Sequence, residues 1–518
     1  MPQLSLLSIV ILGVLFAVVR YVNKSRQRSL KHIRGPSSSS WLVGNEYDLV
    51  HQIEVGKLET PWFREYGTLL RYSGCYGEDV LLIADALALQ HIFHASSYHY
   101  PKSNDVRSNS RRLFGRGLVS AEGETHARHR KALNPAFSAS QLKSFLSLFQ
   151  QETQKVRPLH GTTAKDNGDM PTVDVAKWIS RLTLDIIGRS SFDYDFQAVE
   201  EAESKLAKAL KDFFPIVLTK MDKLQNDWLE ASNKAALQIL DKRANSDSGE
   251  KDADSKDILS ILVRSNNLSD PKKRLDDDEV LAQMSTMILA GHETTGSTSI
   301  WLFYELAKRP EYQERIWNEI EEVRRKKEER GENREENFTP NEYDSMPFFN
   351  AIIKEVLRFH PIAISLFRNP DRDDVIPLQE PIMSLTGEKL TEVPVKKGQR
   401  IHIHIPTYNR LKCVWGEDAE KFNPERFLLD EKRGTMLGMY ANLMTFSAGV
   451  RGCIGWRFAL LELQAILEGL VSNFEFSVDP SLEVIRAQAG AMQPLLRGKE
   501  KEGFQMPLRI KKRARVQA

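Results

Sequence analysis

The residues with the clearest chemical potential lie in a glycine-rich loop that holds one cysteine. The loop runs from Phe446 to Gly455 and contains Cys453, with Arg451 two residues before the thiol. An amphipathic stretch follows and predicts a helix with Gly455 at its start. Backbone N–H groups and the helix dipole at such an N-terminus favour an ionised thiolate. Glycines allow a tight backbone around a flat cofactor, and an arginine can bind an acid group on it.

An unreactive core cysteine is the ordinary alternative, because free cysteines are often buried. The spacing argues against it: with each residue type at roughly 1 in 20, five fixed positions coincide about once in several million windows. The pattern resembles the haem-binding loop of the cytochromes P-450, the haem-thiolate monooxygenases. The resemblance implies haem b with Cys453 as the axial ligand of its iron. The positions that carry it are Phe446, Gly449, Arg451, Cys453 and Gly455.

A second chemically useful pair lies inside the long apolar stretch of residues 276–308. Acidic residues at its start and Pro310 after its end are typical of one long helix. Polar Glu293 and Thr294 in its middle are costly unless they have a role, although a helix kink or helix–helix contact would also explain them. Beside the cysteine loop they resemble the family's acid–alcohol pair. The resemblance implies that they relay protons to dioxygen by general acid catalysis, and it gives the neighbouring His292 no role.

The resemblance also assigns cationic side chains to the haem propionates. His126 and Arg130 lie on a basic stretch that predicts a helix, and residues four apart share one helix face. A basic helix is usually a solvated surface, whereas in the family this pair binds a propionate, with tryptophan more common than histidine at the first position. Arg368 corresponds to the residue that binds the other propionate, and Arg451 assists.

Three further charged residues resemble a structural network of the family. Glu355 and Arg358 lie on a predicted helix, and Arg426 follows at the expected distance before the cysteine loop. The resemblance implies a buried salt-bridged triad, in which loss of one member leaves an uncompensated charge. The segment after the helix corresponds to a pocket-lining strand over residues 360–368. Candidate substrate contacts are Ile362, Ala363, Ile364 and Ser365, with Met492 from a turn near the end of the sequence.

Two other patterns have plainer interpretations. His402 and His404 fall on one face of a predicted strand, which would supply half a metal site. No partner ligands are evident, so we interpret them as a polar face of a sheet. The charge run over residues 321–336 predicts a solvated helix end and loop. Arg128 and Lys131, on the basic stretch, are candidates for contact with an acidic redox partner.

Composition excludes several classes of protein. The 518 residues carry 72 basic and 70 acidic side chains, a net charge of +2, so no nucleic-acid partner is expected. Three cysteines are too few for a disulfide framework or a cysteine-rich zinc site, and they favour a reducing compartment.

The beginning of the sequence predicts a membrane anchor. Residues 4–19 are almost entirely apolar, close to the ~20 residues of a membrane helix. A cleaved signal peptide would have a basic start and a small-residue cleavage site, and a buried helix would not have the basic flank that follows here. Positive charges after the span place the remaining chain in the cytosol. We therefore expect a single-pass anchor in the endoplasmic reticulum membrane.

The resemblance covers nearly the whole chain and implies a mainly α structure with a small β region, the cytochrome P-450 fold, preceded by one transmembrane helix. The expected organisation is a membrane anchor over 1–22, a basic and Gly/Pro/Ser-rich hinge over 23–40, and a catalytic domain over 41–518. The implied enzyme is an oxidoreductase that acts on paired donors with incorporation of molecular oxygen.

Its implied reaction is hydroxylation or epoxidation of a hydrophobic small molecule. Electrons would come from NADPH through a separate NADPH–cytochrome P-450 reductase. The sequence resembles fungal microsomal members of secondary metabolism, which implies a terpenoid or similar substrate. The alternatives are a haem-thiolate isomerase or dehydratase, which often lacks the acid–alcohol pair, and a non-catalytic membrane module that binds haem or sterol.

Overall fold

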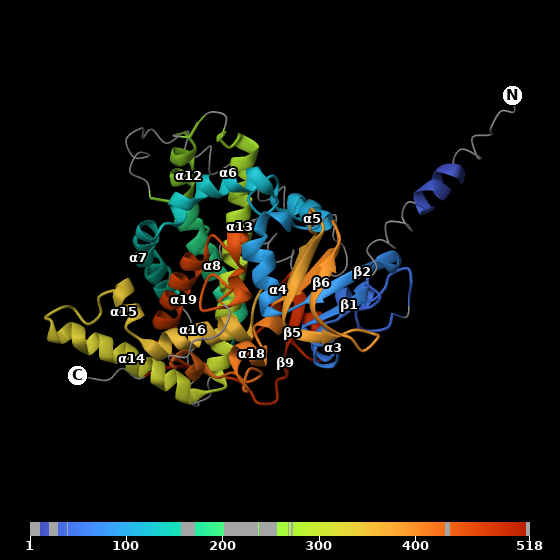
Figure 1. Ribbon diagram of the computed structural model, residues 1–518. Coiled ribbons are helices and arrows are strands. Elements are labelled where there is room, and N and C mark those ends of the chain that lie inside the picture. The colour runs from blue at the N-terminus through green and yellow to red at the C-terminus, as the bar shows by residue number, and fades with distance from the viewer. Residues whose placement is uncertain are drawn as a thin grey trace, which may run out of the picture. The chain divides into compact units, whose positions relative to one another are not determined.

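The computed structural model describes residues 11–19, 30–38, 40–156, 171–200, 237, 256–267, 269–270, 273–429 and 436–513 (Figure 1). Its contacts divide the chain into two units. Unit 1 comprises Met1–Gln52, Gly56–Ser103 and Ser365–Tyr408; unit 2 comprises Ile53–Val55, Asn104–Ile364 and Asn409–Ala518.

Only part of the predicted anchor falls within the described residues. Residues 11–19 are helical and exposed, whereas residues 1–10 and 20–22 lie outside the described part. Among the described helices, none has the length and apolar character needed to cross a membrane.

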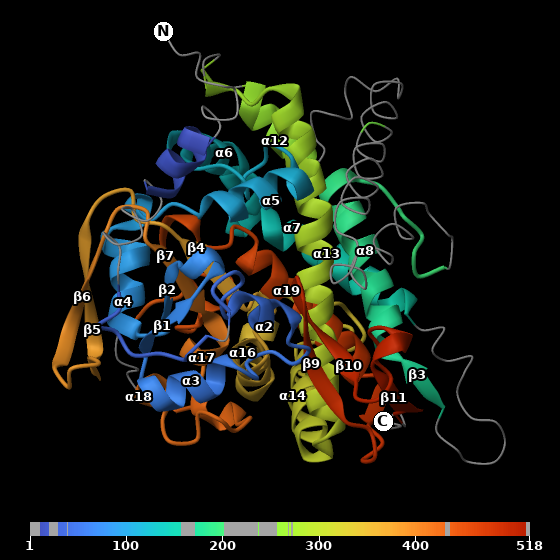
Figure 2. The ribbon, with the colours of Figure 1, turned by 90° about the vertical axis from the view of Figure 1, so that its right-hand side faces the viewer.

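Unit 1 is built on a four-stranded sheet with the order β1-β2-β7-β4 (Figure 2). Strand β2 lies inside this sheet, between β1 and β7. All its apolar side chains from Val80 to Ile83 are buried, as is typical of a strand covered on both faces. It pairs antiparallel with β1 and parallel with β7, and β7 pairs antiparallel with β4. The strands are β1 (Leu69–Ser73), β2 (Asp79–Ile83), β4 (Ser365–Arg368) and β7 (Arg400–His404).

A two-stranded ribbon and short helices complete unit 1. The buried Asp85 carboxylate caps α4 by accepting 3.0 Å hydrogen bonds from the backbone N–H groups of Leu87 and Ala88. The same carboxylate accepts from two N–H groups of β5. These elements are α2 (Glu46–His51), α3 (Glu59–Tyr66), η1 (Cys75–Gly77), α4 (Ala86–Gln90), the π-helix η2 (His91–Ala95), η3 (Ser97–His99), β5 (Asp374–Met383), β6 (Lys389–Val395) and α17 (Ile405–Tyr408).

Unit 2 is organised around α13 (Asp277–Ala307), a helix of 31 residues that stands out in Figure 2. It starts at a capping box, in which Asp276 and Glu279 satisfy each other's backbone N–H groups, and Pro310 begins the next helix. The long helix predicted over residues 276–308 is therefore confirmed. Gly291 lets α13 approach α8 (Val175–Phe192) closely, because a Cβ atom at this position would lie 2.4 Å from Ile187.

Helices α8, α16 and α19 pack against α13, and the aromatic rings of Phe149 and Phe458 join α7 to α19 at 4.9 Å. The helices are α5 (Asn104–Phe114), α6 (Gly123–Leu133), η4 (Asn134–Phe137), α7 (Ala139–Lys155), α8 (Val175–Phe192), α12 (Ile258–Asn267), α14 (Pro310–Glu329), α15 (Pro340–Asp344), α16 (Pro347–Phe359), α18 (Lys412–Trp415), η7 (Pro424–Phe427), η8 (Met444–Phe446), η9 (Gly449–Arg451), α19 (Trp456–Val471) and η10 (Glu500–Glu502).

Two small sheets belong to unit 2, one with the order β3-β11-β8 and one made of β9 and β10. Gly490 has φ +79° and joins β9 to β10 in a tight hairpin, a conformation that favours glycine. The strands are β3 (Thr172–Asp174), β8 (Phe474–Ser477), β9 (Val484–Ala489), β10 (Ala491–Leu496) and β11 (Pro507–Lys512).

Candidate active site

The cysteine loop lies directly before α19, as its sequence predicts. Cys453 donates its backbone N–H to the carbonyl oxygen of Phe446 at 2.8 Å, which closes the loop on itself. Gly449 has φ +63°, where a side chain would be strained. The side chain of Cys453 is accessible. Desolvation by the surrounding protein raises the pKa of its thiol, while the Gly455 N–H and the charge of Arg130 oppose that rise.

Helix α6 lies against this loop through two arginines. Arg130 donates a 2.5 Å hydrogen bond to the carbonyl oxygen of Gly452, next to the cysteine. Arg451 forms a buried ion pair with Glu122, the residue before α6, with 2.9 Å between its Nε and the carboxylate. His126 is buried on the same helix. The sequence did not reveal the role of Glu122, whose only signal is its place at a helix N-terminus.

These residues suit the haem that the sequence implies. A thiol, an accessible position before a helix N-terminus and two neighbouring guanidinium groups match a group with an iron and acid side chains. A Cβ atom at Gly455 would approach no atom of the described chain closer than 3.7 Å. Cys453 would hold the iron, and Arg130 lies near enough to the loop to serve a propionate.

Arg368 belongs to unit 1 and ends β4. Its side chain is buried, donates to the carbonyl oxygen of Phe367 at 2.9 Å and lies over the ring of Phe93 at 5.3 Å. Cation–π contact and hydrogen bonding fix the guanidinium in one orientation.

The acid–alcohol pair lies in the middle of α13. Thr294 has an accessible side chain whose hydroxyl donates to the carbonyl oxygen of Ala290 at 2.7 Å. The side chain of Glu293 is 12% exposed, and burial raises its pKa to about 8. Its Oε1 accepts a hydrogen bond from the amide of Gln493 on β10, and that amide also donates to Ser297 at 2.9 Å. The contact of Gln493 with Glu293 could not be predicted from local sequence, because the two residues are 200 positions apart.

A second buried acid lies beside α13. Glu462 on α19 is 1% exposed, and burial raises its pKa well above the usual range, partly offset by the neighbouring Thr295 hydroxyl. Burial therefore favours the neutral form of the Glu462 carboxyl. In the sequence, Glu462 is visible as an acidic residue in the apolar stretch after the cysteine loop, but the sequence analysis did not single it out.

The predicted triad is in contact within unit 2. Arg358 donates to both oxygens of Glu355 at 2.7 and 2.8 Å, and Arg426 donates to the same carboxylate at 3.3 Å. Glu355 and Arg358 are fully buried. Arg426 also binds Asp418 at 2.9 Å, which extends the predicted triad to a fourth charged residue.

The candidate substrate residues are not all alike. Ile362, Ile364 and Met492 are buried, and the backbone N–H of Met492 donates to the carbonyl oxygen of Ile362 at 2.9 Å. Ala363 is exposed. Ser365 begins β4 in unit 1. The strand predicted from residue 360 begins five residues later, at Ser365.

The two strand histidines, which the sequence places on a polar face of a sheet, are buried on β7. His402 lies between the hydroxyl groups of Ser365 at 2.7 Å and Tyr72 at 3.3 Å. His404 lies 2.7 Å from the hydroxyl of Thr407. No cluster of three potential metal ligands occurs among the described residues. The histidines are polar residues of the interior with hydroxyl partners.

Arg128 is engaged inside the protein. Its guanidinium binds both carboxylate oxygens of Glu279 at 2.8 and 2.6 Å, and the buried His129 lies 3.1 Å from the same carboxylate. Such bidentate pairs are strong and geometrically defined. Arg128 therefore joins α6 to the start of α13, a role its sequence did not indicate.

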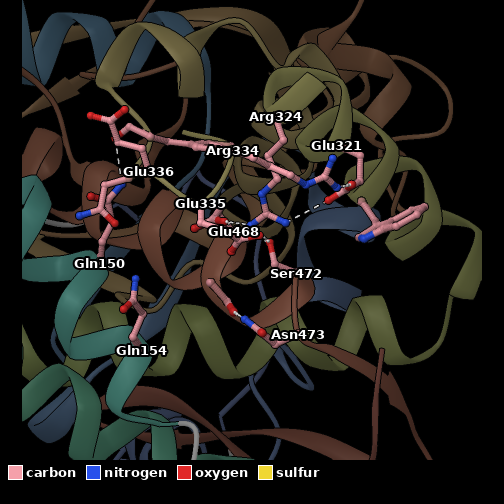
Figure 3. Close-up of a pocket in the computed structure, with 14 residues that line it drawn as sticks. Gln150, Gln154, Glu321, Arg324, Arg334, Glu335, Glu336, Glu468, Ser472 and Asn473 are labelled. Atoms are coloured by element: carbon pink, nitrogen blue, oxygen red, sulfur yellow. Dashed lines mark hydrogen bonds and ion pairs between the residues drawn. The ribbon is translucent and has the colours of Figure 1, made fainter. Parts of the chain in front are cut away.

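A cavity of about 210 Å³ lies apart from these residues, in the region of the charge run (Figure 3). Arg324 connects Glu321 and Glu468 across it, with 2.9 Å to each carboxylate. Lys327 of the same run is only 2% exposed. Most of the run is exposed, as expected for a solvated helix end and loop, but Arg324 forms partly buried ion pairs. The cavity includes neither the cysteine nor the acid–alcohol pair.

Comparison with known proteins places this arrangement in a family. The family model described as Cytochrome P-450 matches residues 34–500. Cytochrome P-450 monooxygenase 128 of Postia placenta is 32% identical over 94% of this chain and 93% of its own length. Cytochrome P-450 monooxygenase claQ of Ampulloclitocybe clavipes is 30% identical over 93% of both chains. With a mainly helical structure and a cysteine loop before α19, the chain belongs to the cytochrome P-450 family.

It is accordingly a haem-thiolate monooxygenase whose cofactor is haem, bound through a cysteine thiolate. Members of the family generally receive electrons from NADPH through a redox partner and act on hydrophobic molecules.

Proposed function

We propose that this enzyme is a membrane-anchored monooxygenase that hydroxylates or epoxidises a terpenoid or similar hydrophobic secondary metabolite. Electrons reach it from NADPH through a separate NADPH–cytochrome P-450 reductase. The observation that carries the monooxygenase reaction is the acid–alcohol pair on α13: burial raises the pKa of Glu293 to about 8, and the Thr294 side chain is accessible. A hydrophobic substrate is supported by the uncharged, apolar character of Ile362, Ile364 and Met492.

Within this proposal, Cys453 is the iron ligand, and Phe446, Gly449 and Gly455 shape its loop. Haem bound there supplies the iron at which dioxygen is reduced and one oxygen atom is transferred to substrate. Propionate binding is assigned to His126, Arg130, Arg368 and Arg451. The ion pair between Arg451 and Glu122 would then orient that guanidinium.

Proton delivery follows from the protonation state of Glu293. With a pKa of about 8, its carboxyl carries a proton at physiological pH and can donate it. Thr294 is the next residue and its hydroxyl oxygen can accept a proton while it donates its own. The pair therefore moves one proton from the buried carboxyl to the accessible side chain.

The anchor is proposed for residues 1–22, followed by a hinge over 23–40 and the catalytic domain over 41–518. Large apolar side chains on the helical residues 11–19 are exposed, among them Phe16 at 64%. Exposed apolar surface of this kind favours contact with lipid. The proposed location is the endoplasmic reticulum membrane, with the catalytic domain in the cytosol.

The test is NADPH consumption and product formation by the purified full chain with a microsomal reductase. Candidate terpenoids are supplied one at a time and products are identified by mass spectrometry. A monooxygenase gives products one oxygen atom heavier, with the label from ¹⁸O-dioxygen. An isomerase or dehydratase would form product without NADPH, and a haem- or sterol-binding module would form none. Either of these results would overturn the proposal.

A further inference from the structure

His292, to which the sequence assigns no role, lies beside the catalytic acid in the interior of unit 2. Its side chain is 4% exposed. Its Nε2 lies 3.0 Å from the hydroxyl of Ser180 on α8. Its Nδ1 is buried and has no hydrogen-bond partner among the described residues, and it lies 3.9 Å from Oε2 of Glu293. Unpaired polar atoms in a protein interior are rare and costly, so this nitrogen calls for an explanation.

The imidazole is suited to carry a proton in either direction. Burial lowers the pKa of His292 to about 4, against the opposing effect of a hydrogen bond with the Ser180 backbone, so the ring is neutral at physiological pH. A neutral imidazole has one N–H and one acceptor nitrogen. When Nε2 accepts from the Ser180 hydroxyl, the proton is on Nδ1, the nitrogen nearer to Glu293.

Among the described residues, the hydrogen bond to the Glu293 carboxyl is made at one of its two oxygens. Gln493 binds its Oε1, whereas Oε2 is the oxygen nearer to His292. The distance between Nδ1 of His292 and Oε2 of Glu293 is 3.9 Å. A rotation of the carboxyl that shortens this distance by about 1 Å would bring the two atoms within hydrogen-bond distance. Ser180, at the other end of the chain of contacts, is half-buried.

We propose that Ser180 and His292 form a proton-supply branch that reprotonates Glu293 after it has given its proton to Thr294. The Glu293 carboxylate takes the proton from Nδ1 of His292, Nε2 takes the proton of the Ser180 hydroxyl, and Ser180 is reprotonated by solvent water. One proton enters for each that leaves, and no electrons move. Each passage leaves His292 as its Nε2–H tautomer, and the Nδ1–H tautomer returns through the imidazolium before the next passage. The branch rests on the proposed role of Glu293, and His292 and Ser180 are positioning residues in it.

A purely structural role is the competing explanation, because the Ser180–His292 contact also joins α8 to α13. His292→Gln separates the two roles. A glutamine amide retains a hydrogen bond to Ser180 but cannot exchange protons as an imidazole does. Ser180→Ala removes the outer end of the branch and leaves His292 in place.

The experiment follows hydrogen–deuterium exchange at the protonated Glu293 carboxyl by rapid-mixing infrared spectroscopy of the haem-loaded full chain. The sample is kept below pH 8, where Glu293 carries its proton. The band is assigned by its loss in Glu293→Gln. Glu462, another buried acid whose pKa burial raises, is the internal control, and its carboxyl band is assigned by its loss in Glu462→Gln. No reductase or NADPH is present, so the measurement does not depend on turnover.

We expect exchange at Glu293 to slow by about tenfold or more in both His292→Gln and Ser180→Ala, with Glu462 unchanged. Unchanged exchange at Glu293, or equal changes at Glu293 and Glu462, would overturn the branch. Turnover with reductase is measured on the same wild-type preparation. Absence of turnover would overturn the proposed function while the exchange rates would still decide whether Ser180 and His292 supply Glu293 with protons.

Discussion

Replacing Glu355 by glutamine removes the charge at the centre of the buried network while keeping the shape of the side chain. Arg358 is fully buried and has Glu355 as its ion-pair partner, with three backbone carbonyl oxygens as its other acceptors. Arg426 keeps Asp418 at 2.9 Å. The variant therefore leaves one buried guanidinium without a counter-charge. Breaking a buried pair in this way costs about 3–5 kcal/mol of the free energy of unfolding.

Urea denaturation of the haem-loaded protein, followed by tryptophan fluorescence, measures the change. We expect the midpoint to fall substantially in Glu355→Gln. The matched control is Glu322→Gln, which removes an exposed pair with Arg325 on α14 and should leave the midpoint unchanged, because such pairs contribute little. Equal, small effects of the two substitutions would refute the reasoning that burial makes the network essential.

Three further outcomes follow from α13. Thr294→Ala should keep haem but divert reducing equivalents to peroxide; unchanged coupling of NADPH to product would contradict the assigned role. Turnover should decline as pH rises through about 8, because Glu293 then loses the proton it donates, and Glu293→Gln should lack this limb of the pH profile. Gly291→Ala places a Cβ atom 2.4 Å from Ile187 and should destabilise the protein by about 1–3 kcal/mol in thermal unfolding; wild-type stability would contradict the observed close packing.

Much of the fold was predictable from local signals. The capping box at Asp276 and the proline at position 310 fix the limits of α13, and alternation and turn residues locate β1 and β2. The strand expected from residue 360 begins only at Ser365. The local sequence predicted too long a strand, because apolar residues such as Ile362 are buried whether or not they belong to a sheet.

The candidate site was less predictable where its contacts are distant in sequence. The positions of Glu293 and Thr294 on one helix follow from spacing, whereas the contact between Glu293 and Gln493 spans 200 residues. The pairing of Arg451 with Glu122 spans 329 residues. Such pairings depend on how helices and hairpins pack, which no local pattern encodes.

The most direct test of the central claim is the spectrum of the reduced protein with carbon monoxide. If Cys453 binds haem iron, the wild-type chain gives the strongly red-shifted Soret band of a thiolate-ligated haem, and Cys453→Ser loses that band. Cys413→Ser, at an exposed cysteine outside the loop, is the matched control and should retain it. A Cys453→Ser variant that keeps the red-shifted band, or a wild-type protein that binds haem without it, would contradict the assignment of this cysteine.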